Sequence, residues 1–141
     1  MTVDFIFSST TSHYIEDLEH LFSNVSRACF SVIHPIYSAM YPIEHGDIFP
    51  KDEEWAVRYL DRSVRAYIQP WIEYNEAFEN HLSKSYRHTF ADYVNAIIGA
   101  GLMIEQIYEP IAPEKWKVPE PDRYEGFIET PVYMIIKMRK R

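Results

Sequence analysis

A group of polar side chains follows the first apolar stretch of the chain. The run at residues 3–7 gives way to hydroxyl groups and a histidine–tyrosine pair, namely Ser8, Ser9, Thr10, His13 and Tyr14. An apolar run followed by small polar residues and an amphipathic segment is typical of a buried strand that leads into a helix. In open α/β sheets, ligands bind outside the carboxyl ends of such strands. The sequence therefore predicts a ligand site at the end of the first strand.

Two histidines are candidates for acid–base chemistry at that site. His13 stands at the entry to the first predicted helix, and His34 ends the second predicted strand. If the two strands are neighbours, both imidazoles converge on one cleft, where either could orient a substrate or accept a proton. The alternative for His13 is a capping or solvent-exposed role.

The elements that would position these residues alternate between strand and helix. Strands are predicted at 3–7, 28–33, 102–108 and 132–136, and helices at 14–27 and 89–100. Thr89 with Asp92 resembles a capping box, and Gly101 is the residue type expected just beyond a helix end. The almost continuously apolar run 132–136 predicts a strand inside the sheet, covered on both faces.

A long insertion, residues 36–88, separates the second strand from the late helix. We expect loop at 36–51 and helix from about 52 to 84, interrupted at Pro70, with a second loop at 110–130. A connection this long is often a lid over a site. Its aromatic residues wall a pocket for an apolar acceptor or simply pack the insertion on the sheet; they are Tyr37, Tyr41, Trp55, Tyr67 and Trp71.

Composition excludes several classes of protein. The 141 residues predict one domain, and the net charge of −7 disfavours binding to nucleic acid. The only cysteine, Cys29, rules out an intrachain disulfide and fits a reducing cytoplasm. No apolar run approaches the roughly 18 residues that span a membrane, and we see no signal peptide. The histidines and cysteine lack metal-ligand spacing, so no metal is expected.

The order of elements resembles the C-terminal half of a class I S-adenosylmethionine-dependent methyltransferase. Four stretches carry the resemblance, and together they cover nearly the whole chain: residues 4–17, 30–35, 86–110 and 130–136. The resemblance implies a partial Rossmann-like α/β sheet with two parallel strands first and an antiparallel last strand inserted between the two before it. The strands at 3–7, 28–33, 132–136 and 102–108 would then lie side by side in that order.

The resemblance also implies roles for particular residues. Ser8, Ser9 and Thr10 would line the methionine end of S-adenosylmethionine, and His13 and His34 would face the reacting groups. The residues facing a small-molecule acceptor would be Tyr14, Tyr37, Trp55, Trp71, Arg87 and His88.

Two features of the sequence depart from the family pattern. The family places a Gly-rich cofactor turn after its first strand, whereas none of the four glycines here follows a strand in that way. The family also has a longer turn where Arg27 runs directly into the second strand, which could strain the crossover.

We therefore expect a chain that is weak or inactive alone. An exposed first strand would pair with a second copy or with a separate N-terminal half. The alternative is a non-catalytic interaction module, and a weaker one is a domain that binds a small ligand through the aromatic insertion.

Overall fold

The computed structural model describes residues 5–40, 59–67 and 83–141. Trp55, Trp71 and most of the predicted helix at 52–84 lie outside these ranges. The helices and strands, in chain order, are β1 (Ile6–Ser9), η1 (Ser12–Tyr14), α1 (Leu18–Ser23), β2 (Arg27–Ile33), α2 (Pro35–Met40), β3 (Arg65–Tyr67), β4 (Ser83–Ser85), α3 (Phe90–Gly99), β5 (Leu102–Tyr108), η3 (Glu114–Trp116), α4 (Pro121–Glu129) and β6 (Tyr133–Lys140).

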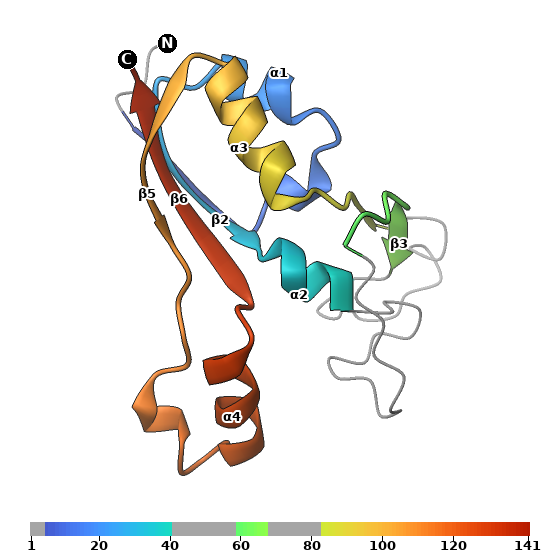
Figure 1. Ribbon diagram of the computed structural model, residues 1–141, viewed down its shortest axis with the longest axis vertical. Coiled ribbons are helices and arrows are strands. Elements are labelled where there is room, and N and C mark those ends of the chain that lie inside the picture. Colours follow the sequence, from blue (N-terminus) through green and yellow to red (C-terminus); the bar gives the residue numbers. More distant parts are fainter. Residues whose placement is uncertain (1–4, 41–58, 68–82) are drawn as a thin grey trace, which may run out of the picture.

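Four strands form one sheet in the order β1-β2-β6-β5 (Figure 1). β1 pairs with β2 in parallel, and β6 is antiparallel to both of its neighbours. This arrangement confirms the predicted fold class, a partial Rossmann-like sheet with the last strand inserted. Because β1, β2 and β5 run the same way, their carboxyl ends share one edge of the sheet.

The hydrophobic core lies between the sheet and two helices, α1 and α3 (Figure 1). Phe22 of α1 meets Phe30 of β2 edge to face, with ring centroids 5.4 Å apart. Ile97 of α3 is fully buried against the same layer. Burying side chains of this size stabilises the fold by roughly 1.5–3 kcal/mol each. The two helices therefore hold the strands whose ends carry the candidate site.

The late helix begins and ends as predicted. The Thr89 hydroxyl accepts a hydrogen bond from the backbone N–H of Asp92, and the Asp92 carboxylate accepts one from the backbone N–H of Thr89. The chain leaves α3 through Gly101, which has a positive φ of 74°. Both ends of this helix are thus fixed by local chemistry that the sequence shows.

The first helix is shorter than predicted. The 14–27 segment forms the single turn η1 and then α1, which ends at Ser23, because Ser23 and Asn24 donate side-chain hydrogen bonds to the carbonyl oxygen of His20. Asp17 caps its start by accepting from the backbone N–H of His20 at 2.8 Å. Residues 24–26 are therefore left to connect α1 with β2, which supplies the link that the sequence seemed to lack.

Other boundaries also differ from the predictions. β1 is displaced toward the hydroxyl residues, so Ser8 and Ser9 lie within the strand. In the described part of the insertion, β3 and β4 pair as antiparallel strands where helix was predicted, and α2 occupies the start of the predicted loop. The predicted loop at 110–130 contains η3 and α4, which begins with Pro121 in its first turn, a position that proline favours.

Among the described residues, only one face of the last strand is covered. Along β6, Met134, Ile136 and Met138 are buried, whereas Ile135 and Lys137 between them are half-exposed. The prediction of cover on both faces is therefore wrong for the described residues, because the described helices α1 and α3 lie on one side of the sheet (Figure 1).

Candidate functional site

Hydroxyl groups at the carboxyl ends of β1 and β2 are joined in a small network. The backbone N–H of Thr10 donates to the Ser31 carbonyl oxygen at 2.8 Å and lies 3.1 Å from the Ser31 hydroxyl. Ser31 in turn donates to the Ser9 hydroxyl at 3.2 Å. Thr10 has a φ of 48°, which is unusual for a residue with a β-branched side chain. The network turns the chain sharply away from β1 toward η1.

His13 is buried in the turn that follows. Only 7% of its surface is exposed, and its Nδ1 has no hydrogen-bond partner among the described residues. Its backbone carbonyl oxygen accepts a hydrogen bond from the backbone N–H of Tyr86 at 2.7 Å. Because Tyr86 directly follows β4, this bond connects η1 to the end of that strand. Burial lowers the pKa of His13 from 6.5 to about 4, and the neighbouring His88 contributes to the shift. The imidazole is therefore neutral at pH 7 and resists protonation.

His34 sits at the end of β2 with both ring nitrogens engaged. The backbone N–H of Ile36 donates to Nδ1 at 3.1 Å, so Nε2 carries the hydrogen and donates to Glu109 Oε1 at 2.7 Å. The imidazole is 3% exposed, whereas the Glu109 side chain is 53% exposed. This geometry favours a role for His34 in positioning Glu109 at the edge of the sheet.

Sequence reasoning missed Glu109 as a candidate. It directly follows β5, whose carboxyl end lies at the same edge as that of β2. The predicted strand order could have identified Glu109. In that order β5 runs parallel to β2, two places away in the sheet, so the residue after β5 lies at the same edge as His34.

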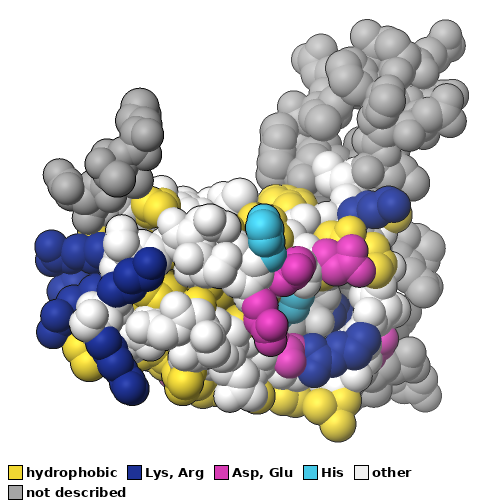
Figure 2. All heavy atoms as spheres, turned by 90° about the horizontal axis from the view of Figure 1, so that it is seen from above, with side chains coloured by type: hydrophobic (Ala, Val, Ile, Leu, Met, Phe, Trp, Pro, Cys, Tyr) yellow, Lys and Arg dark blue, Asp and Glu magenta, His cyan; other side chains and the backbone are white. Residues whose placement is uncertain are grey.

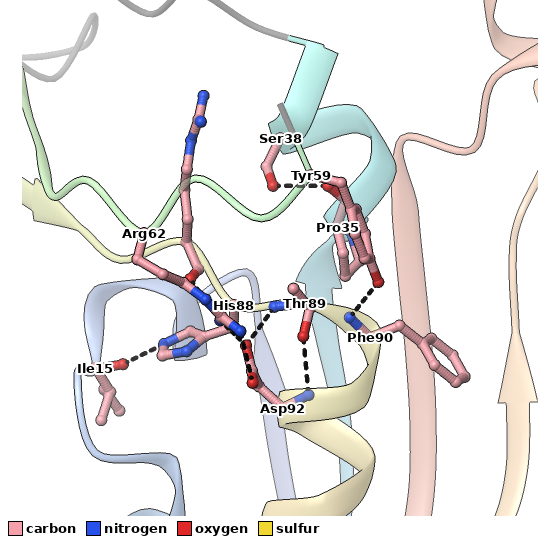
Figure 3. Close-up of polar contacts among 10 residues, drawn as sticks. Ile15, Pro35, Ser38, Tyr59, Arg62, His88, Thr89, Phe90 and Asp92 are labelled. Atoms are coloured by element: carbon pink, nitrogen blue, oxygen red, sulfur yellow. Dashed lines mark hydrogen bonds and ion pairs between the residues drawn. The ribbon is translucent and has the colours of Figure 1, made fainter. Parts of the chain in front are cut away.

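A segment of the insertion is fastened to the start of α3 (Figure 3). Arg62 pairs with both carboxylate oxygens of Asp92, and Asp61 accepts from Arg87 at 2.6 Å. The Tyr59 hydroxyl accepts from the backbone N–H of Phe90 at 2.9 Å. Burial alone would raise the pKa of Asp92, but hydrogen bonds from Arg62 and Thr89 outweigh burial and lower it. Arg87, predicted to face a substrate, thus makes an ion pair within the protein.

His88 lines an open groove between the start of α1 and α3. Its Nε2 donates to the Ile15 carbonyl oxygen at 2.8 Å (Figure 3). Its ring stands edge to face against the Tyr93 ring, with centroids 5.4 Å apart. The groove has a volume of about 890 Å³, which is within the usual range for ligand sites. Figure 2 shows acidic side chains gathered beside histidine and arginine on this surface. The lining residues are Glu16, Asp17, Leu18, Glu19, Arg62, His88, Asp92, Asn95 and Ala96.

The other predicted site residues lie in different places, some near the ends of β1 and β2 and others apart from them. The Tyr14 ring lies 4.0 Å from the His13 ring, centroid to centroid, and Tyr37 is half-buried on α2. Ser8 pairs in register with Phe30, so it faces the α1 and α3 side of the sheet, away from Ser9. Neither His13 nor His34 lines the groove. The structure therefore brings the β1 and β2 ends together but separates them from the groove.

The described residues form neither a metal-ligand cluster nor a membrane-spanning helix. In residues 5–40, 59–67 and 83–141, no three metal-ligating side chains cluster. Within the same ranges, no helix is long and apolar enough to cross a bilayer.

The described residues fit one end of S-adenosylmethionine. Ser9 and Thr10 offer hydroxyl groups at the carboxyl end of β1, and the unpartnered Nδ1 of His13 lies in the turn directly after them. The described glycines do not form a phosphate-type or methionine-binding turn, since Gly99 and Gly101 are at the end of α3 and Gly126 is in α4.

Comparison with solved structures agrees with this fold. The chain is similar to a protein from Mesorhizobium loti described as an S-adenosylmethionine-dependent methyltransferase, with 24% identity and a TM-score of 0.70 over 99% of this chain. It is also similar to a Listeria monocytogenes protein assigned to the same class, with 23% identity and a TM-score of 0.67 over 98%. No family model matches the chain, and no curated protein of similar sequence was found.

The match covers the two solved proteins only in part. The chain spans 62% of the Mesorhizobium loti protein and 61% of the Listeria monocytogenes protein. The predicted resemblance is thus confirmed, and the chain shares its fold with S-adenosylmethionine-dependent methyltransferases over nearly all of its own length.

Proposed function

We propose that this chain forms part of an S-adenosylmethionine-dependent methyltransferase that acts on a small molecule. The observation that carries the proposal is the sheet order β1-β2-β6-β5 with its antiparallel insertion, in a chain that aligns over 98–99% of its length with two proteins of that class. Polar groups lie where such sheets bind ligands, at the carboxyl ends of β1 and β2.

The chemistry asks little of individual side chains. S-adenosylmethionine supplies an electrophilic methyl group on a sulfonium, and the sulfur leaves as a neutral thioether. The protein mainly aligns the acceptor and excludes water. In this proposal Ser9 and Thr10 hold the methionine end of the cofactor, and the neutral imidazole of His13 orients the acceptor by accepting a hydrogen bond at Nδ1.

Two residues would act at the acceptor side. Glu109 is held by the fixed imidazole of His34 and is more than half exposed at the same sheet edge. Its carboxylate would favour an acceptor with a hydroxyl, amine or other donor group.

Cofactor binding tests the proposal. Because these 141 residues supply only one end of the site, isothermal titration with S-adenosylmethionine should show weak binding, with a dissociation constant on the order of 1 mM. Ser9→Val should weaken it further, whereas Ser23→Val, on the exposed end of α1, should not. Micromolar binding by this chain alone would contradict the incomplete cleft, and no binding at all would contradict the cofactor assignment.

A second candidate function is an interaction module. It is favoured by β1, which has β2 on one side and no described strand on the other, and by Phe7, which is 68% exposed on that strand. Sedimentation velocity distinguishes a monomer from a self-associated chain. If copies associate through β1, the Phe7→Ser variant should associate more weakly. A monomer at all concentrations would exclude self-pairing.

A further inference from the structure

The short segment between β4 and α3 holds the turn that follows the first strand. We call this segment, residues 86–89, the strap. The backbone N–H of Tyr86 donates to the His13 carbonyl oxygen at 2.7 Å. Two residues further on, His88 Nε2 donates to the Ile15 carbonyl oxygen at 2.8 Å (Figure 3). One of these carbonyls lies in η1 and the other directly after it, so the strap fixes η1 at both positions.

The same strap is bonded to the insertion. Arg87, between the two residues that hold η1, donates to Asp61 Oδ2 at 2.6 Å. Only 10% of the Arg87 side chain is exposed, so salt screens this ion pair weakly, and loss of the carboxylate would leave a largely buried cation without this counter-charge. Asp61 is itself fixed, because its Oδ1 accepts from the backbone N–H of Ser63 at 2.9 Å. The pair is therefore a firm contact between the insertion and the strap.

A second ion pair of the insertion leads elsewhere. Arg62 pairs with Asp92 in the first turn of α3 (Figure 3). The Arg62 side chain is 51% exposed, so water and salt weaken this pair more than the first. Arg62 also reaches the Arg87 carbonyl oxygen, but only at 3.4 Å. The short and largely buried link from the insertion to the strap is thus the ion pair between Arg87 and Asp61.

His13 reports whether the strap is in place. Its carbonyl oxygen is bonded to the strap, and the imidazole is enclosed, with 7% of the residue exposed. Burial and the nearby His88 lower its pKa to about 4. If the strap moved away from η1, water would reach the ring and this pKa would rise.

We propose that Arg87 is a positioning residue, which couples the docked insertion to the shape of η1. With Asp61 bound to Arg87, the strap is held against the turn that follows the hydroxyl groups of β1. Without this ion pair, the strap and η1 loosen together while the sheet and α3 stay folded. By linkage, a ligand held at η1 strengthens the docking of the insertion by the same factor by which docking strengthens ligand binding. The coupling to a ligand rests on the proposed function, whereas the coupling between strap and turn does not.

Amide hydrogen exchange, followed by NMR on this chain, tests the coupling. The variant is Asp61→Asn, whose amide oxygen can still accept from Ser63 while the negative charge facing Arg87 is gone. Exchange of the Tyr86 amide should become about tenfold faster. Exchange at Ile97, which is fully buried inside α3, should change much less, because the fold as a whole is kept. Equal factors at both amides would indicate a general loss of stability and would overturn the proposal.

The imidazole of His13 gives a second readout, which a merely structural role of the ion pair would not move. Its pKa, measured by NMR titration, should be about 4 in the unaltered protein and should rise toward 6.5 in Asp61→Asn. The rise follows from water reaching the ring once η1 loosens. The same pKa in both proteins would contradict the coupling.

Two further variants are matched controls. Asp61→Glu keeps a carboxylate for Arg87 and should restore most of the slow exchange at Tyr86. Glu120→Gln removes a carboxylate from an ion pair with Arg123 of α4, away from the strap (Figure 1), and should leave both readouts unchanged. Equal effects of Asp61→Glu and Asp61→Asn, or an equally large effect of Glu120→Gln, would overturn the role assigned to the charge.

Titration with S-adenosylhomocysteine separates this coupling from the proposed function. Bound ligand should slow exchange at Tyr86 in the unaltered protein, and Asp61→Asn should bind the ligand several-fold more weakly. Equal binding by both proteins would contradict the coupling to the ligand. Absence of binding would contradict the proposed function alone, because the exchange at Tyr86 and the pKa of His13 still decide the role of Arg87.

Discussion

His13 shows how one buried side chain links stability with function. Its imidazole is enclosed by the η1 turn, lacks a partner at Nδ1 and lies near His88, so the charged form is disfavoured. The same features keep it neutral beside the carboxyl end of β1, where its Nδ1 can accept a hydrogen bond. A group held in this way makes the stability of the fold depend on pH.

Acidification should unfold the protein partly through His13. The unfolded chain takes up a proton near pH 6.5, whereas the folded protein resists protonation until about pH 4. Stability is therefore complete above pH 6.5 and falls as the pH drops toward 4, by at most about 3 kcal/mol for this group. Urea unfolding at pH 7 and pH 4.5 measures the loss.

Two variants separate His13 from other groups. His13→Gln cannot titrate, so its stability should fall less between pH 7 and pH 4.5 than that of the unaltered protein. His20→Gln removes an exposed imidazole from α1 and should keep the His13-dependent loss. An identical pH dependence in His13→Gln and the unaltered protein would rule out the assigned cause.

Among the elements, α3 is the one whose limits follow from local sequence. Thr89 and Asp92 close a capping box at its start, and Gly101 follows its end with a positive φ. The helix also receives the ion pair from Arg62, which fastens the insertion beside the groove. Its exact limits therefore position both the core and the groove-lining residues.

Two alanine substitutions at the end of α3 should act in opposite directions. Gly101→Ala places a Cβ on a left-handed backbone and should destabilise the fold by about 1–2 kcal/mol. Gly99 is helical, and an added Cβ there meets no atom within 4 Å, so Gly99→Ala should stabilise by roughly 0.5–1 kcal/mol. Urea unfolding of both variants checks this, and a shift of the same sign in both would contradict it.

Sequence alone predicted the elements that local patterns determine. The four strands, their order and α3 followed from apolar periodicity, caps and the family resemblance, and all are present. The end of α1 did not follow, because the side chains of Ser23 and Asn24 both donate to the His20 carbonyl oxygen, in a segment whose sequence is still amphipathic.

The candidate site was predicted less completely than the fold. His13 and His34 lie near strand ends as expected, but the hydrogen bonds of His34 and the ion pair of Arg87 depend on residues 75 and 26 positions away in the sequence. No local pattern reveals such partners. The predicted strand order was enough to place Glu109 at the site, whereas nothing in the sequence pattern placed Arg62 and Asp61 of the insertion there.

At the scale of the whole molecule, the chain presents two distinct surfaces. The carboxyl ends of β1 and β2 carry the hydroxyl network and the two buried histidines, and the face of the sheet opposite α1 and α3 carries the exposed side chains of Phe7 and Tyr108. The two surfaces are on different parts of the sheet, so each can be tested alone.

The most direct test of the central claim is a residue-by-residue titration of the ¹⁵N-labelled chain with S-adenosylhomocysteine, followed by NMR. Because weak binding still moves amide signals, the account predicts shifts concentrated at residues 8–14 and at His34, with small changes elsewhere. Adenosine, which lacks the methionine end, should produce much smaller shifts at residues 8–14. Shifts centred on residues 110–130, or none at millimolar concentration, would contradict the claim that this sheet edge holds the cofactor.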